Sequence, residues 1–235
     1  MTFSWKRINA IFQKDFKDFS RNLAVSIVIF LPLFIAAIYG RMGLDTIQAH
    51  FLCINMTFAM VGTYVQCCLI AEEKEKNTLR GLMLSPASTL EILGGKSLLS
   101  FVLTIVIIFF SAFLSEYNPT NITLVAIAII ISAVFYIAVG TLLGLIAKSV
   151  MESSVLVLPV IGIFSLGSFV TVWAEKYPIL KLAEYMPSVQ LIELATLVEE
   201  GAKFSDVLSN LGIISLWAVL FIVLTVIVYR KRMVD

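Results

Sequence analysis

The sequence predicts an all-α, polytopic membrane protein with six transmembrane helices. The chain is 60% hydrophobic and 14% charged, with a mean hydropathy of +0.98, whereas a soluble domain usually carries about 25% charged residues. Its apolar residues are concentrated in six long runs that lack Asp, Glu, Lys and Arg. The basic residues between these runs fall mainly on one side of the predicted bilayer.

Each uncharged run is long enough to cross the bilayer as a helix, which takes roughly 20 residues. Strands are excluded because a single strand cannot satisfy its backbone hydrogen bonds in lipid. No internal repeat divides the chain, so residues 1–235 form one transmembrane domain. The predicted spans are residues 22–40, 51–71, 97–115, 122–147, 153–174 and 207–229.

The orientation follows from the positive-inside rule, by which Lys and Arg accumulate on the cytoplasmic side. With the N-terminus inside, thirteen of the seventeen basic residues fall on the cytoplasmic side. The outer side holds only Arg41, Lys176, Lys181 and Lys203. Both termini are therefore predicted to be cytoplasmic.

Residues 1–21 predict an amphipathic helix in the headgroup layer, because an aromatic-rich apolar face alternates with basic residues. Two interpretations remain open: a simple interfacial anchor, or an elbow helix that braces the bundle. The apolar face consists of Phe3, Trp5, Ile8, Ile11, Phe12, Phe16 and Phe19.

The inner loop between the second and third runs has the clearest local signals. Its acidic start suits the N-terminal region of a helix, and Ser85-Pro86 then breaks that helix. Ser88 and Glu91 form a predicted capping box, so a new helix begins there and continues into the third span. The segment is either a solvated loop or a docking site for a soluble partner.

Several classes of function are not supported. Gly95-Lys96-Ser97 resembles the end of a phosphate-binding loop, but Leu90 occupies the position of its first glycine, so nucleotide binding by this chain is rejected. No nucleophile–base pair, paired carboxylates or zinc spacing is present, and Cys53, Cys67 and Cys68 fit buried thiols. We expect no enzyme activity, no metal and no cofactor in this chain, and its net charge of +1 gives no indication of nucleic-acid binding.

The outer segment, residues 175–206, contains an apolar stretch too short to span. It predicts either a helix lying on the outer surface or a re-entrant lid over a translocation path. The spans themselves carry no Asp, Glu, Lys or Arg, which argues against an ion-coupled carrier. Four polar residues of the second span are either interhelical hydrogen-bonding groups or a weak indication of a substrate path: Asn55, Thr57, Thr63 and Gln66.

Taken together, these features resemble the permease subunits of ABC exporters of the ABC-2 type (type V). The inner loop matches the family pattern of acidic residues, a Gly-Thr-Leu triplet, a Pro-Xaa-Ser corner and a Gly-Lys pair. The matching residues are Glu73, Glu75, Asn77-Thr78-Leu79, Pro86-Ala87-Ser88 and Gly95-Lys96. Asn77 departs from the family glycine, although Asn tolerates a similar turn geometry. The second match is Tyr185-Met186-Pro187-Ser188, followed by Leu191 and Glu193.

The resemblance implies that two permease subunits pair and that each binds a separate ATPase, which carries ATP and Mg. Residues 72–90 would contain the coupling helix, residues 1–21 the elbow and residues 175–206 the outer gate. The implied setting is a bacterial plasma membrane, and the implied cargo is hydrophobic or amphipathic, such as a drug or an antimicrobial-type peptide. The implied ATPase-coupling residues are Glu72, Glu73, Glu75, Thr78, Leu79, Arg80, Leu82 and Met83, and the implied gate residues are Pro187, Leu191 and Glu193. A non-transporting immunity or sensor component and an ion-coupled secondary carrier remain as alternatives.

Overall fold

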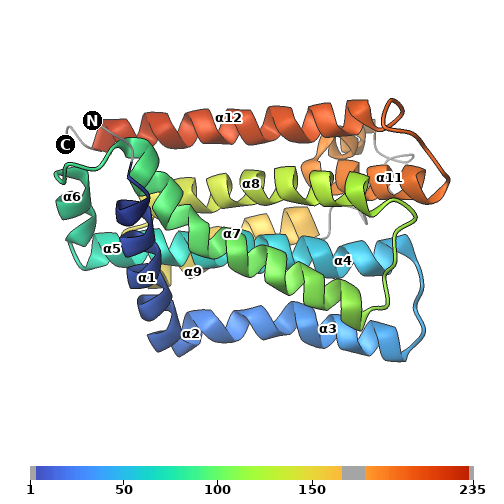
Figure 1. Ribbon diagram of the computed structural model, residues 1–235, viewed down its shortest axis with the longest axis horizontal. Helices are drawn as coiled ribbons and strands as arrows, with labels where there is room; N and C mark the ends of the chain where they lie inside the picture. Colours follow the sequence, from blue (N-terminus) through green and yellow to red (C-terminus); the bar gives the residue numbers. More distant parts are fainter. Residues whose placement is uncertain (1–3, 166–177, 233–235) are drawn as a thin grey trace.

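The computed structural model describes residues 4–165 and 178–232, and this part of the chain is a bundle of helices (Figure 1). Five helices are long and apolar enough to cross a membrane. The predicted all-α polytopic class is therefore confirmed. For the fifth predicted span, the structure describes a shorter apolar helix, α9 (Val150–Ser165), and residues 166–174 lie outside the described part.

The N-terminal helix α1 (Trp5–Arg21) lies across one end of the bundle, at a steep angle to the long helices (Figure 1). The chain then turns at Asn22 into the first span, which consists of α2 (Leu23–Ser26), the 3₁₀ segment η1 (Ile27–Ile29) and α3 (Phe30–Arg41). The most apolar stretch of this span is only 17% buried. It therefore lies at the edge of the bundle.

The second span is the centre of the bundle. It runs without interruption through α4 (Ile47–Thr57), a π-helical segment η2 (Phe58–Val65) and α5 (Gln66–Glu75). Its most apolar stretch is 83% buried. The neighbouring helices pack around it, and α8 (Ile122–Ile146) comes closest: a Cβ on Gly140 would lie 2.5 Å from the backbone oxygen of Thr63. Only glycine permits that approach.

The inner loop contains a short helix, α6 (Thr78–Met83), but the prediction that its acidic residues lie at the start of a helix is wrong. Glu72, Glu73 and Glu75 lie in the last residues of α5, because that helix continues beyond the uncharged run of the second span. Asn77 has a φ of 57°, the left-handed conformation that ends α5. The capping box of Ser88 and Glu91 is confirmed, and it starts α7 (Thr89–Leu114). This helix begins eight residues before the predicted span because its first turns contain Glu91 and Lys96, which a search for uncharged runs leaves out.

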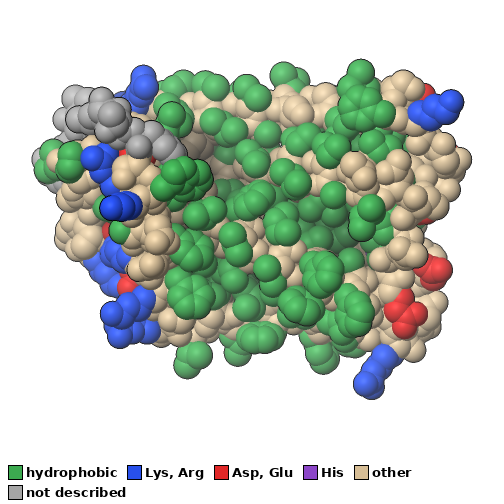
Figure 2. Space-filling model, in the orientation of Figure 1, with side chains coloured by type: hydrophobic (Ala, Val, Ile, Leu, Met, Phe, Trp, Pro, Cys, Tyr) green, Lys and Arg blue, Asp and Glu red, His purple; other side chains and the backbone are tan. Residues whose placement is uncertain are grey.

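At the opposite end, the 3₁₀ segment η3 (Pro178–Tyr185) leads into α11 (Pro187–Glu199), and the chain returns through α12 (Leu208–Arg232). Helix α12 packs along α8, and it ends at the same end of the bundle at which α1 lies (Figure 1). Figure 2 shows an apolar band between two ends that carry the charged side chains, with Lys and Arg gathered at the end of α1. The chain is therefore a multi-pass membrane protein.

Candidate functional site

The candidate site is the end of the bundle formed by α1, α6 and the adjoining ends of α5 and α7, called the α6 end below. At this end α6 projects beyond the long helices, and α1 lies beside the first turns of α7 (Figure 1). Gly95 makes that packing possible, since a Cβ there would lie 3.1 Å from the Cβ of Ile11. The Gly-Lys pair therefore serves helix packing.

A buried ion network joins three of these helices. Lys96 of α7 is only 1% exposed, and its Nζ lies 2.6 Å from Oδ1 of Asp15 on α1 and 2.8 Å from Oε1 of Glu73 on α5. Lys14 also pairs with Glu73, and the Thr78 hydroxyl at the start of α6 donates to the same carboxylate. Glu73 thus connects α6 to both α1 and α7.

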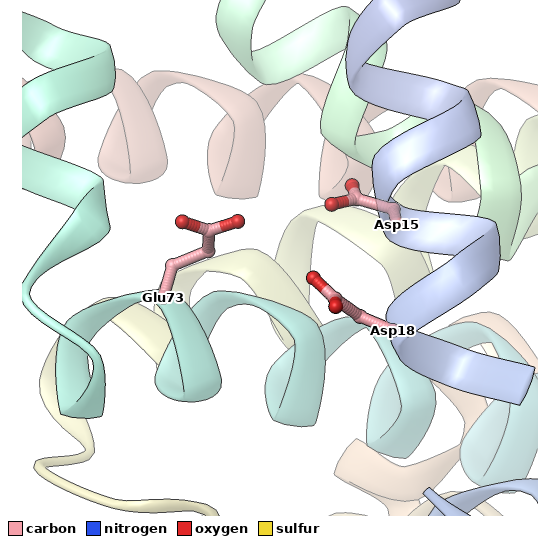
Figure 3. A group of neighbouring side chains, drawn as sticks. All are labelled: Asp15, Asp18 and Glu73. Carbon is pink, nitrogen blue, oxygen red and sulfur yellow. The ribbon is translucent and has the colours of Figure 1, made fainter. Parts of the chain in front are cut away.

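Three carboxylates converge at this network, namely Asp15, Asp18 and Glu73 (Figure 3). Three acids could hold a cation, but the ammonium groups of Lys14 and Lys96 already lie among them. We therefore interpret the cluster as an ion-pair network and not as a metal site. Burial raises the pKa of Asp15 from 3.8 to about 6, and the nearby charge of Lys96 opposes that rise.

A second connection holds the N-terminal end of α1. The Ser4 N–H donates to Oε1 of Glu91 at 2.6 Å, and the Arg7 guanidinium pairs with the same carboxylate at 3.2 Å. Arg7 also donates to the backbone oxygen of Pro86 at 3.2 Å. Since Glu91 completes the capping box with Ser88, the start of α7 and the start of α1 are fixed by one side chain.

The three acids predicted to couple to an ATPase all have partners within the chain. Glu72 pairs with Lys76 at 2.5 Å, and Glu73 belongs to the buried network. Glu75 is exposed, and it accepts the Val150 N–H at 3.0 Å at the start of α9. These acids hold the inner loop in place against the bundle.

The remaining predicted coupling residues lie on α6. Leu79 is buried in a small apolar cluster, Leu82 is half-buried, and Thr78 is exposed apart from its bond to Glu73. Arg80 and Met83 belong to the same helix, but their side chains lie outside the described part. Among the apolar side chains that the structure describes here, Leu84 is the most exposed, at 80%, directly after α6.

The predicted gate residues lie at the other end of the bundle. Pro187 is the first residue of α11 and is buried, as is Leu191. Helix α11 packs against α4, α8 and α12, which fits a re-entrant helix better than one lying on the outer surface. Glu193 is exposed and accepts a hydrogen bond from the Gln190 amide at 3.0 Å.

The four polar residues of the second span face the core of the bundle. The Gln66 amide donates to Thr141 of α8 at 2.9 Å and accepts from Ser100 of α7 at 2.7 Å. The Thr63 hydroxyl donates to a backbone oxygen of α8, and Thr57 bonds within its own helix. The Asn55 amide approaches the Ser188 backbone oxygen of α11 at 3.5 Å. In a single chain these residues serve helix packing.

Comparison with known protein families decides the identity of the chain. Residues 13–227 match the family model described as ABC-2 family transporter protein. The chain belongs to the ABC-2 transporter family. A search of curated proteins found no significant match.

As an ABC-2 family member, the chain is the membrane-embedded permease subunit of an ABC transporter, and the ATPase is a separate chain. Sequence reasoning missed the residues that tie this permease together at the α6 end: Lys14, Asp15 and Lys96. One signal was available for Asp15, which shares the helical stripe of Ile8, Ile11 and Phe19 that faces the bundle.

Proposed function

We propose that this ABC-2 permease belongs to an ATP-driven exporter and that the α6 end is the surface on which its ATPase docks. The observation that carries the proposal is the position of α6, which projects from the bundle while Thr78 and Glu73 tie it to the buried Lys96 network. A force applied to α6 would therefore reach α1, α5 and α7 together. ATP and Mg would bind to the ATPase.

The electrostatics at the α6 end support this orientation. Lys and Arg gather there, as expected for a cytoplasmic face, so both termini would lie in the cytoplasm of a bacterial cell (Figure 2). Leu84 would supply an apolar anchor for the ATPase, because a side chain that is exposed in the free subunit contributes to binding when it becomes fully desolvated in a well-packed pocket near the centre of an interface. Leu79 would act indirectly, since it supports α6 from within the core.

The exporter would work as a pair of permeases, and its cargo would be hydrophobic or amphipathic. The edge position of the first span leaves an apolar flank free for a second permease or for lipid. In the described part of the long helices, Asp, Glu, Lys and Arg occur only towards the ends, so no mid-membrane group is available to couple transport to an ion.

The test is co-purification of the permease with its ATPase, using Leu84→Asp against Met42→Asp. Both side chains are well exposed, but Met42 lies at the opposite end of the bundle. We expect Leu84→Asp to weaken ATPase binding by about ten-fold or more, since a central apolar anchor contributes at least 1–2 kcal/mol. Met42→Asp should bind as the wild type does.

Equal binding by Leu84→Asp and the wild type would rule out the α6 end as the docking surface. A second measurement addresses export: uptake of a fluorescent amphipathic drug into inside-out vesicles that contain both subunits. ATP-dependent uptake supports the exporter. A stable, ATP-hydrolysing complex that moves no cargo in this assay would favour the non-transporting alternative.

A further inference from the structure

A lateral cavity of about 350 Å³ opens between α7, α8 and α12, away from the network described above. It is lined by Gly94 and Phe101 of α7, Ala138 of α8, and Ile222 and Val226 of α12, among others. Gly94 lies near the start of α7 and Val226 near the end of α12. The cavity therefore lies in the half of the bundle nearest to the α6 end.

The wall of the cavity is mainly hydrocarbon, and its polar residues are Ser97, Thr141 and Thr225. The Thr225 hydroxyl donates to the backbone oxygen of Ala138 at 3.1 Å, and the Thr141 hydroxyl donates to that of Ile137 at 2.8 Å. Ile222 is 40% exposed, so the cavity is open towards the surrounding bilayer. A polar occupant would lose hydrogen bonds to water there, whereas an apolar chain would lose none.

Two adjacent glycines show how α7 is shaped around this opening. A Cβ on Gly95 would press on α1, but a Cβ on Gly94 would meet no atom within 4 Å. The surface of α7 is thus closed on the α1 side and open on the cavity side. A Cβ added at Gly94 would displace no protein atom, so a substitution there is a way to place a side chain at the cavity that Gly94 lines.

Positive charge follows the cavity-lining residues along α12. Arg230 follows Val226 by four residues on α12, so it lies on the same helical face about 6 Å closer to the end of the bundle. Both Arg230 and Lys231 are exposed, and neither has an acidic partner among the described residues. A ligand with an apolar chain and an anionic head would match both features.

We propose that this cavity binds one acyl chain of an anionic phospholipid, whose phosphate is held by Arg230. The lipid comes from the leaflet at the α6 end. A helix of a second copy is the alternative occupant, but an apolar helix would offer no anionic group to the exposed Arg230. Arg230 can form charge-assisted hydrogen bonds to the phosphate of either kind of head, but the exposed Arg230 and Lys231 favour an anionic head because a zwitterionic head carries its own cation and has no net negative charge.

The test uses the full-length protein in phosphatidylcholine bilayers that contain phosphatidylglycerol with a photoreactive group in one acyl chain. Peptides from α7 and α12 that line the cavity should carry more cross-linked lipid than peptides from α3, which is also open to lipid. Gly94→Phe should lower this labelling at least about three-fold. The matched control is Gly212→Phe on α12, where an added Cβ also meets no atom within 4 Å and no lining residue is affected.

The headgroup is tested by comparing photoreactive phosphatidylglycerol with photoreactive phosphatidylcholine. We expect the wild type and Lys17→Gln to prefer the anionic lipid, and Arg230→Gln to lose that preference. Lys17 is an exposed lysine of α1, outside the cavity. Circular dichroism and size-exclusion chromatography check the fold of each variant, and Gly94→Leu provides a smaller filling side chain if Gly94→Phe does not fold.

Three results would overturn the proposal. Labelling that does not exceed that of α3, or that persists in both Gly94 variants, would show that the cavity takes up no specific lipid. Equal labelling by the two lipids in the wild type would show that Arg230 does not select an anionic headgroup. Conversion of a dimer to a monomer by Gly94→Phe would assign the cavity to a second copy of the chain.

Discussion

The substitution Lys96→Met tests whether the buried network holds α1 against the bundle. Methionine keeps the length of the side chain and its helix propensity but removes the ammonium group between Asp15 and Glu73. Glu73 retains Lys14 as a partner, whereas Asp15 loses the lysine that neutralises it. The cost of the substitution therefore falls mainly on Asp15.

The magnitude follows from the protonation of Asp15. Breaking a buried ion pair by removing one partner costs about 3–5 kcal/mol. The variant can limit this cost by protonating Asp15, and because the pKa of Asp15 in the folded wild type is about 6, that protonation costs only about 1.4 kcal/mol at pH 7. We expect Lys96→Met to lower the free energy of unfolding by about 1–2 kcal/mol at pH 7 and by less than about 0.5 kcal/mol at pH 5, where Asp15 is already largely protonated in the wild type.

The assay is equilibrium unfolding in mixed micelles, followed by circular dichroism at both pH values. Lys17→Met is the control, because Lys17 is exposed on the same helix, and we expect it to change stability by less than about 0.5 kcal/mol. Asp15→Asn combined with Lys96→Met should recover at least about 1 kcal/mol relative to Lys96→Met alone. A cost at pH 7 no larger than that of the control, or no recovery in the double variant, would refute the role of the network.

Four further predictions use the same unfolding assay. Burial raises the pKa of Asp15 to about 6, so the contribution of Asp15 to the free energy of unfolding is greatest below pH 4 and declines as the pH rises through 6. Asp15→Asn should therefore make the free energy of unfolding depend less on pH in this range. Gly144→Leu should cost more than about 2 kcal/mol, because its Cβ would lie 2.7 Å from atoms of α5, whereas Gly212→Leu should cost less than 1 kcal/mol. Ser88→Ala should cost about 1 kcal/mol through the lost cap, and an unchanged stability would show that Glu91 alone starts α7. Asn77→Gly should be nearly neutral and Asn77→Val should cost about 1–2 kcal/mol, because φ is 57°; equal effects would contradict the strain argument.

Local patterns were enough to predict most of the fold. Uncharged runs identified the long helices because the bilayer imposes both their length and their composition. The capping box at Ser88 was predictable because its two partners are three residues apart. The turn at Asn77 was predictable for a similar reason, since the conformational preference resides in the residue itself.

The buried network was not predictable in this way. Lys96 pairs with residues 81 and 23 positions earlier in the chain, and no local pattern connects them. Glu73 was expected to contact an ATPase because it matches the acidic residues of the family pattern in the inner loop. The burial of Glu73 is explained by the fold, because α1 and α7 place Lys14 and Lys96 beside its carboxylate and neutralise its charge.

The different burial of the first two spans has a consequence for how the sequence can vary. The first span has the higher mean hydropathy, 2.5 against 1.5, yet 17% of its apolar stretch is buried against 83% for the second. Most apolar side chains of the first span contact lipid tails, which can adapt to hydrophobic side chains of different shapes. Those of the second span pack against protein side chains, which leave little room for a change of shape. In a saturation-mutagenesis library, we therefore expect the more hydrophobic helix to be the more permissive one, so that tolerance to substitution follows burial and runs opposite to hydropathy.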